Sequence, residues 1–411
     1  MEALYLFNPD NDMALACGDP YYMAPASARR MAAELSALPA WWAEEGASVL
    51  LDTAWRAKVI TEQFPLPLPV QWVTEISSIY NKVCPWGWSP SLVHRLQEAG
   101  VASSVCPSKE QMERIRQLSG RQTAVEILRR CHVAMNAAPV SPYVKSSGSY
   151  AGVLPLAGES FLFSSLKEVE AFVLSHPKAV LKSPWSGSGR GIQYTSGEFP
   201  LPLKGWVEHI LATQHQVAGE PLYDKIIDFA MEFFSDARKG CLRFIGYSLF
   251  NTDKRGSYKE NLLAPDADIE SRLAKYVSPE ILHRVRETLL IELADVISGD
   301  YQGYLGVDMM VCRTTTERDQ ERYVLHPCVE INLRMNMGVV AHRIYDKYVS
   351  RGAHGRYVIE YYARPGEAEQ AHLAFQQQYP LKLADERVES GYLSLTPVMQ
   401  DTAYQAYIII G

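Results

Sequence analysis

Short hydrophobic runs alternate with amphipathic segments through the N-terminal quarter of the chain. Apolar runs predict strands at Ala3–Phe7 and Ser48–Leu51, and apolar residues at helical spacing predict a helix at Pro25–Leu38. A further helical pattern follows the aromatic, turn-rich segment Pro85–Pro90. Because strands that alternate with helices favour a parallel sheet covered by helices, we predict an N-terminal parallel α/β domain over residues 1–118.

A different pattern, with more strands, begins after residue 118. Ser119 and Gln122 have the spacing of a capping box, which predicts the start of a helix and a domain boundary at this point. The segment 178–195 is predicted as a strand, a glycine-rich loop and a second strand, and strand patterns dominate beyond it. One long helix interrupts them, with Ser278-Pro279 at its start.

The composition is that of an ordinary globular protein, and it argues against several kinds of partner. The 411 residues are 47% hydrophobic and 21% charged with a formal net charge of −7, so two or three domains are expected. The acidic balance argues against binding nucleic acid or an anionic membrane surface. No secretory signal is recognisable, and no apolar run approaches the ~18 residues of a membrane span. The seven cysteines include no C-x-x-C pair, so we predict a reduced, cytoplasmic protein.

Two strand patterns in the last third of the chain carry the first candidate site. In YLGVDMMV the alternation makes Asp308 the only charge on its face, and in YVLHPCVEINLR it puts Glu330 and Asn332 on one face. If the strands form a hairpin centred near Asp319, Asp308 lies opposite Glu330.

Facing carboxylates repel each other unless a cation, a proton or water compensates. Oxygen donors of this kind suit magnesium, which takes one or two carboxylates and completes its shell with phosphates and water. The alternative is a solvated sheet face with incidental charges. His326 and Cys328 share the predicted face, where we expect a packed histidine and a buried cysteine rather than a catalytic pair.

The second candidate is the segment AVLKSPWSGSGRGI, in which Lys182 ends an apolar strand. The backbone amides and serine hydroxyls of its loop can cradle phosphate oxygens while Lys182 supplies a positive charge. The loop lacks the Gly-Lys-Ser/Thr ending of a Walker A motif. A hairpin loop without a ligand is the alternative.

The third candidate lies in GEPLYDKIIDFAMEFF. Glu220 stands in a predicted loop, and Asp228 and Glu232 share one face of the strand that follows. Taken alone, this segment is better explained as an edge strand with a polar face.

Together and in this order, the three candidates resemble the ATP-grasp superfamily, from Ser119 to Gly338. The resemblance implies a two-lobed ATP-grasp fold with antiparallel sheets: a small lobe over 119–218 with the glycine-rich loop, and a large lobe over 219–411 with the metal site. It also implies ATP and Mg²⁺, or Mn²⁺ in its place, as cofactors. The implied metal ligands are Asp308, Glu330 and Asn332, since EINLR resembles the recurring Glu-x-Asn-x-Arg of the family.

The same resemblance assigns residues to the nucleotide. Arg121 matches the first basic residue of the family, where lysine is common, and Lys182 matches the second, which touches the phosphates. Asp228 matches the carboxylate that binds the ribose hydroxyls, with Glu232 as the alternative. The implied nucleotide-binding residues are Arg121, Lys182, Ser186, Gly187, Ser188, Gly189, Glu220, Leu222 and Asp228.

The implied activity is an ADP-forming ligase that makes a carbon–nitrogen bond between a small-molecule carboxylate and an amine. Lys182 and Arg334 would stabilise the acyl phosphate, and Arg243 is a further candidate because Gly306 stands where many members have an arginine. Two alternatives stay open: a phosphotransferase acting on a hydroxyl, and a nucleotide-gated binding protein without turnover. The segment Asn8–Asp12 follows the first predicted strand, so it is either a substrate contact or a capped turn.

Overall fold

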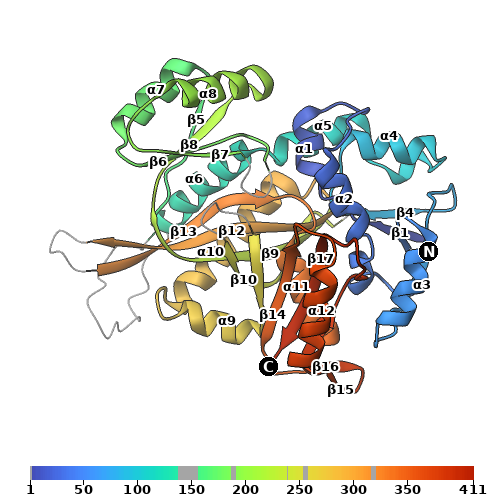
Figure 1. The fold of residues 1–411 in the computed structure, drawn as a ribbon. Coiled ribbons are helices and arrows are strands. Elements are labelled where there is room, and N and C mark those ends of the chain that lie inside the picture. The colour runs from blue at the N-terminus through green and yellow to red at the C-terminus, as the bar shows by residue number, and fades with distance from the viewer. Residues whose placement is uncertain (1, 138–155, 187–190, 238, 253–257, 316–320) are drawn as a thin grey trace. The chain divides into compact units, whose positions relative to one another are not determined.

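The computed structural model describes residues 2–137, 156–186, 191–237, 239–252, 258–315 and 321–411 (Figure 1). The chain divides into two compact units. The first contains Met1–Arg116, Ser248–Asp268 and Arg334–Gly411, and the second contains Gln117–Tyr247 and Ile269–Leu333. The division into three domains stays a prediction.

The first unit contains a four-stranded parallel sheet in the order β3-β2-β1-β4. Its strands are β1 (Ala3–Leu6), β2 (Ser48–Leu50), β3 (Gln71–Val73) and β4 (Lys82–Pro85). The helical segments of this region are α1 (Asn11–Cys17), α2 (Ala26–Glu34), the 3₁₀ turn η1 (Leu38–Trp41), α3 (Ala54–Gln63), α4 (Pro90–Glu98), the 3₁₀ turn η2 (Ser103–Val105) and α5 (Lys109–Leu118). Alternate residues of β1 enter different hydrophobic clusters, Leu4 with Leu96 and Tyr5 with Ala40. The predicted parallel α/β layer is confirmed.

The C-terminal segment completes the first unit with antiparallel strands. Their order is β11-β14-β17-β16-β15. Trp41 donates from Nε1 to the carbonyl of Leu395 at 2.7 Å, so the two ends of the chain pack together inside this unit. The elements are β11 (Tyr258–Leu263), α11 (Met337–Tyr348), β14 (Gly355–Tyr361), α12 (Glu367–Gln378), β15 (Lys382–Ala384), β16 (Arg387–Ser394) and β17 (Tyr404–Ile410).

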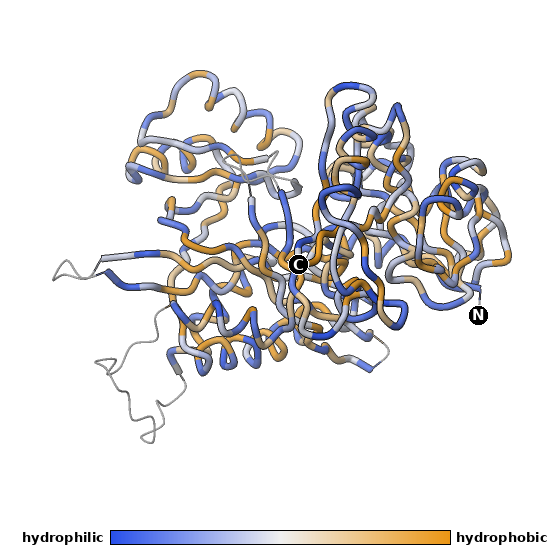
Figure 2. The backbone as a smooth tube through the Cα atoms, turned by 60° about the horizontal axis from the view of Figure 1, so that its bottom comes forward, coloured by the Kyte–Doolittle hydropathy of each residue, from blue (hydrophilic) through white to orange (hydrophobic). Residues whose placement is uncertain are grey.

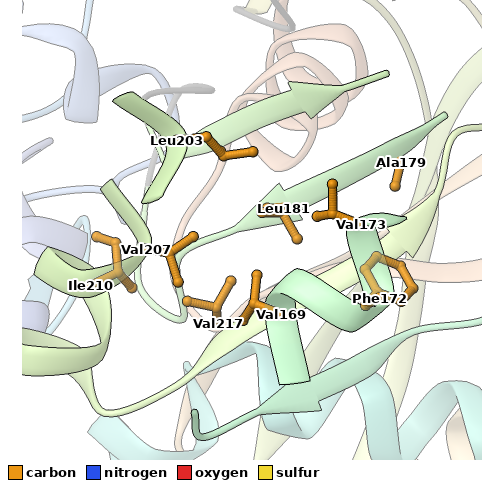
Figure 3. Close-up of a cluster of buried hydrophobic side chains, with 9 residues drawn as sticks. All are labelled: Val169, Phe172, Val173, Ala179, Leu181, Leu203, Val207, Ile210 and Val217. Atoms are coloured by element: carbon orange, nitrogen blue, oxygen red, sulfur yellow. The ribbon is translucent and has the colours of Figure 1, made fainter. Parts of the chain in front are cut away.

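The second unit contains a small antiparallel sheet in the order β5-β8-β6-β7. Its elements are β5 (Phe161–Phe163), α7 (Leu166–Ser175), β6 (Ala179–Lys182), β7 (Ile192–Thr195), α8 (Leu201–Gln214) and β8 (Val217–Pro221). A capping box formed by Ser165 and Glu168 starts α7. Val173 of α7, Leu181 of β6 and Val207 of α8 lie in one buried cluster (Figure 3). This cluster anchors β6, at whose end Lys182 stands.

The other sheet strands of the second unit run antiparallel in the order β13-β12-β9. They are β9 (Asp224–Asp236), β12 (Gly303–Thr315) and β13 (Glu321–Asn332). Strand β10 (Cys241–Thr252) passes from the second unit to the first at Ser248, and α9 (Asp266–Leu273) passes back at Ile269. The two long helices are α6 (Arg121–Ala137) and α10 (Pro279–Ile297). Helix α10 begins where predicted, whereas α6 begins after Ser119, and Gln122 donates from its side chain to the carbonyl of Gln117.

Hydrophobic and hydrophilic residues alternate over short distances along the backbone (Figure 2). In keeping with this, none of the helices in the described ranges has the length and hydropathy needed to cross a membrane.

Candidate functional site

Asp308, Glu330 and Asn332 meet where β12 pairs with β13. Asp308 lies opposite Glu330, and Gly306 lies opposite Asn332, so the predicted pairing at this point is confirmed. Asn332 donates from Nδ2 to Oδ2 of Asp308 at 3.1 Å. Antiparallel partners project to the same side, so two carboxylates and a carboxamide share one sheet face. The predicted centre of the hairpin, Asp319, lies outside the described residues.

A bulge in β13 sets this register. Between the pair Met310–His326 and the pair Asp308–Glu330, β12 advances by two residues and β13 by four. Pro327 stands in the longer stretch, and bulges are among the few places where a sheet tolerates a residue without an N–H group. If the regular pairing nearer the hairpin tip continued without the bulge, Cys328 would lie opposite Asp308 in place of Glu330.

Strand β9 adds two carboxylates to the same face. Glu232 lies opposite Gly306, and Asp228 lies opposite Met310. Glu232 is 1% exposed, and it stands in the same row of the sheet as Asn332. Asp228 lies farther along the strand, in the row of His326. Of the two candidate ribose ligands, Glu232 is therefore nearer to the three predicted metal ligands.

The oxygen atoms of this face suit a magnesium site that phosphate or water completes. Within the described ranges, no three His, Cys, Asp or Glu side chains are grouped so as to hold a metal ion. Magnesium, however, usually takes only one or two carboxylates from the protein and shares its other positions with phosphates and waters. Such an incomplete set of ligands is available here. It consists of the carboxylates of Asp308 and Glu330 and the side-chain oxygen of Asn332, if the Asn332 amide turns its Oδ1 toward the ion. The side chain of Glu330 is 30% exposed, so a hydrated ion can approach it.

Arg121, the first residue of α6, contacts both Glu330 and the segment that leads into the glycine-rich loop. Its Nη2 lies 3.4 Å from the Glu330 carboxylate and 3.4 Å from the Ser186 hydroxyl. Its Nε donates to the carbonyl of Ser183 at 3.0 Å, and its backbone N–H donates to that of Pro184 at 3.2 Å. The side chain is 6% exposed, and its Nη1 is buried without a hydrogen-bond partner in the described part of the chain.

The base of the glycine-rich loop is closed by a backbone contact. Ser183 donates from its N–H to the carbonyl of Gly191 at 2.8 Å. A Cβ atom on Gly191 would come within 2.0 Å of the Ser183 hydroxyl, so any other residue there would force the side chains of Ser183 and Ser186 to move. The predicted phosphate-binding residues Gly187, Ser188 and Gly189 lie outside the described residues.

Lys182 and Glu220 form a buried ion pair across the small sheet. Lys182 Nζ lies 2.5 Å from Glu220 Oε2, and the side chains are 7% and 6% exposed. Lys182 pairs with Ala218 in the ladder, so the ion pair is a diagonal contact between adjacent strands. Ser160 also donates from its hydroxyl to Glu220 Oε1 at 3.1 Å. Burial raises the pKa of Glu220, but the charge of Lys182 and its other neighbours bring the pKa below its ordinary value.

A buried histidine, His326, lies close to this ion pair. It is 0% exposed, and neither ring nitrogen has a hydrogen-bond partner in the parts of the chain that the structure describes. Its ring packs edge-on against Tyr223, with 5.5 Å between the centroids. Burial lowers the pKa of His326 to about 4, so the imidazole is neutral. Cys328 is buried too, and burial raises the pKa of its thiol. Both residues are packed, as predicted.

Leu222 lies between β8 and β9, and Arg243 lies in β10. The backbone N–H of Leu222 donates to the carbonyl of Lys178 at 3.0 Å, so this donor is already used within the small sheet region. Arg243 is exposed and its guanidinium lies 5.2 Å from the ring centroid of Phe234. Phe234 is two residues beyond Glu232 in β9.

Arg334 belongs to the first unit, where it forms a forked ion pair with Asp12. The distances are 3.0 Å from Nε to Oδ1 and 2.8 Å from Nη2 to Oδ2. Nearby in the sequence, Asn8 donates to the carbonyl of Gly87 at 2.8 Å, which joins the segments that follow β1 and β4. The strand order reverses between β1 and β4, and ligands of open α/β sheets bind at such a point.

Arg121, Lys182 and Arg334 are thus each paired with a carboxylate. Such pairing avoids isolated charges in poorly solvated positions. A phosphate would compete for the cations, and a metal ion would compete for the carboxylates. The pairs are Arg121–Glu330, Lys182–Glu220 and Lys225–Asp228 in the second unit and Arg334–Asp12 in the first.

Comparisons with known proteins give structural matches alone. A scan against protein-family models found no match, and neither did a search of curated proteins. The chain aligns over 100% of its length with 36% of pyruvate carboxylase from Rhizobium etli, with a TM-score of 0.51 and 11% identity. It aligns over 100% of its length with 87% of biotin carboxylase from Campylobacter jejuni, with a TM-score of 0.49 and 10% identity. With N5-carboxyaminoimidazole synthase from Aspergillus clavatus it aligns over 100% of its length and 94% of that chain, with a TM-score of 0.48 and 14% identity.

The likeness to pyruvate carboxylase shows that the chain has an ATP-grasp fold, as the sequence resemblance predicted. At identities this low a shared fold does not fix the reaction, which has to be argued from the site.

Proposed function

We propose that this chain, which has the ATP-grasp fold, is a magnesium-dependent, ADP-forming ligase that joins a small-molecule carboxylate to an amine. The observation that carries the proposal is the convergence of Asp308, Glu330 and Asn332 on one sheet face, with Arg121 in contact with Glu330. Two carboxylates and an amide oxygen are the kind of set that binds magnesium together with nucleotide phosphates. When bound, the ion would neutralise phosphate charge.

In the proposed reaction a carboxylate oxygen of the substrate attacks the γ-phosphorus of ATP. The bond to the bridging oxygen breaks, ADP leaves, and an acyl phosphate forms. The amine then attacks the acyl carbon and inorganic phosphate leaves, so no covalent bond to the protein is needed. In phosphoryl transfers of this kind, positioning and charge stabilisation supply most of the rate enhancement.

Different residues of the second unit would bind the phosphates, the base and the ribose of the nucleotide. Lys182 and Arg121 would bind phosphate oxygens once their carboxylate partners are exchanged, and the Leu222 carbonyl would accept from the base. Asp228 or Glu232 would accept from the ribose hydroxyls. The loop Ser186, Gly187, Ser188 and Gly189 would cover the phosphates.

Arg334 would stabilise the acyl phosphate, with Arg243 as the alternative. The forked geometry of Arg334 on Asp12 supports this role, because the same fork matches a substrate carboxylate or phosphate. The segment Asn8–Asp12 would then contribute to the binding of the acid.

The proposal is tested by measuring ADP formation from MgATP with a panel of acids and amines. With a productive pair, D308N and E330Q should each lower the rate by about 10²–10³. The matched control is E321Q, a glutamate at the far end of the same strand whose side chain is 60% exposed, and it should keep the wild-type rate. Unchanged rates in D308N and E330Q would refute the proposal.

The identity of the product separates the alternatives in the same assay. A stable phosphorylated product in place of an amide would identify a phosphotransferase. Tight MgATP binding without ADP formation across the whole panel would identify a nucleotide-gated binding protein.

A further inference from the structure

We propose that Arg121 is an internal counter-ion for Glu330 and that it is exchanged for magnesium when the nucleotide binds. The inference rests on the proposed function and adds a positioning residue to it. Its starting point is the contact of Arg121 Nη2 with the Glu330 carboxylate, at 3.4 Å.

The sheet face needs such a counter-ion. Asp308 and Glu330 face each other across adjacent strands, and the carboxylate of Glu232 is in the neighbouring row. Like charges at facing positions repel, so each carboxylate needs a compensating partner. Asn332 donates to Asp308, and Arg121 compensates Glu330. A metal ion shared by Asp308 and Glu330 would compensate both carboxylates and so replace both contacts.

The way Arg121 is held explains why an arginine stands where the family resemblance leads one to expect lysine. Its Nε is fixed to the Ser183 carbonyl at 3.0 Å while its Nη2 reaches both Ser186 and Glu330. A guanidinium has five donors in a planar fork and can bridge these acceptors together. A lysine ammonium carries its three donors on one atom, so it is less suited to contacting the loop segment and Glu330 at the same time.

One donor of Arg121 is still available. Nη1 is buried and has no hydrogen-bond partner among the described residues. A buried donor without a partner is unfavourable, so it is expected to take an acceptor that comes within reach. A phosphate oxygen is such an acceptor. Once a metal ion takes Glu330, Nη2 becomes free as well, and the fork can bind phosphate in two places.

The exchange predicts effects of opposite sign on the two ligands. In R121Q, Glu330 loses its competing cation, so Mn²⁺ without nucleotide should bind about three- to tenfold more tightly than to the wild type. In the same variant, ATP in the presence of EDTA should bind about tenfold more weakly, because a phosphate-binding cation is gone. A residue that only binds phosphate would leave the Mn²⁺ affinity unchanged.

The two affinities are measured separately. Mn²⁺ binding is followed by the electron paramagnetic resonance signal of the free ion, and ATP binding in EDTA by titration calorimetry. R121K is the matched variant that keeps the charge and loses the fork, and it should change Mn²⁺ affinity in the same direction but less. An Mn²⁺ affinity that is unchanged or weaker in R121Q would overturn the proposal.

A double-mutant cycle in the melting temperature gives a second readout. Melting temperatures of the wild type, R121Q, E330Q and the double variant should show a favourable coupling without ligands that disappears at saturating MgATP. Equal coupling in both conditions overturns the exchange while leaving the proposed function intact. A wild type whose melting temperature does not respond to MgATP, and which forms no ADP, removes the proposed function and the exchange with it.

Discussion

Replacing Lys182 by methionine should destabilise the second unit more than replacing Lys182 and Glu220 together. The two side chains are 7% and 6% exposed and 2.5 Å apart. In K182M the Glu220 carboxylate would stay buried, with the Ser160 hydroxyl at 3.1 Å as a remaining donor. Removing one partner of a buried ion pair costs about 3–5 kcal/mol, because the other charge is left uncompensated.

The double variant K182M/E220Q removes that charge. Both side chains are then neutral, and Ser160 can still donate to the amide oxygen. Replacing a whole buried pair by neutral groups of similar volume is often close to neutral in stability. We therefore expect K182M/E220Q to recover about 2–3 kcal/mol of the loss in K182M. Together with the single variant E220Q, these variants form a double-mutant cycle that measures the coupling between the two sites.

The pH dependence of K182M provides an independent check. Burial is the strongest influence on the pKa of Glu220, and the charge of Lys182 opposes it. Without Lys182 the folded-state pKa should rise above the ordinary value of 4.5. A group with a raised pKa takes up its proton more readily in the folded state, so the stability lost in K182M should shrink as the pH falls toward 4.5 and grow at neutral pH.

Urea unfolding followed by circular dichroism gives the free energies, and hydrogen exchange of the β6 and β8 amides assigns them to the small sheet. The matched control is K204M, since Lys204 and Glu208 form an exposed pair at 3.9 Å in the same unit. Breaking an exposed pair of this kind usually changes stability by less than about 1 kcal/mol. If K182M loses no more than K204M, or if the cycle is additive, the reasoning is wrong.

Three further predictions concern other parts of the chain. Burial lowers the pKa of His342, but the carboxylates of Asp266 and Asp346, 3.7 and 3.2 Å from its ring nitrogens, raise it from 6.5 to about 9. Its contribution to stability should therefore be full below pH 6.5 and be lost as the pH rises through about 9; unfolding of wild type and H342N from pH 6 to 10 measures this, and parallel profiles would contradict it. Gly158 has φ +115° and a Cβ there would come within 2.8 Å of a buried imidazole, so G158A should cost about 1–3 kcal/mol in urea unfolding, whereas G205A, with open space around its Cβ, should not. D12N should lower the stability of the first unit by about 1–2 kcal/mol, because Arg334 loses a charged partner; an unchanged melting temperature would count against a structural role for the fork.

The sequence pattern was sufficient for features that depend on local periodicity. The alternation of strands with helices identified the parallel layer around β1. The alternation of side chains along each strand identified the face that Asp308 shares with Glu330. The start of α10 was predicted too, because Ser278-Pro279 is a local signal. These features need only the spacing of residues within one or two neighbouring elements.

Contacts between distant segments could not be predicted in this way. Nothing in the sequence around Arg121 indicates that its side chain reaches Glu330. All the elements from α6 to β12, including the small sheet, lie between these two residues along the chain. The same holds for the pair formed by Arg334 and Asp12, whose residues are 322 positions apart. Such contacts depend on the tertiary packing of whole elements, for which a single sequence carries no periodic signal.

The bulge at Pro327 means that the candidate metal site depends on the number of residues in β13 as well as on their types. If β13 ran on regularly from the hairpin tip, Cys328 would lie opposite Asp308 and Glu330 opposite Gly306, so every candidate ligand would be present but out of register. A search for this site in other sequences should therefore count the residues between the hairpin and the glutamate, since a chain without the bulge needs two residues fewer there to keep the same pairing.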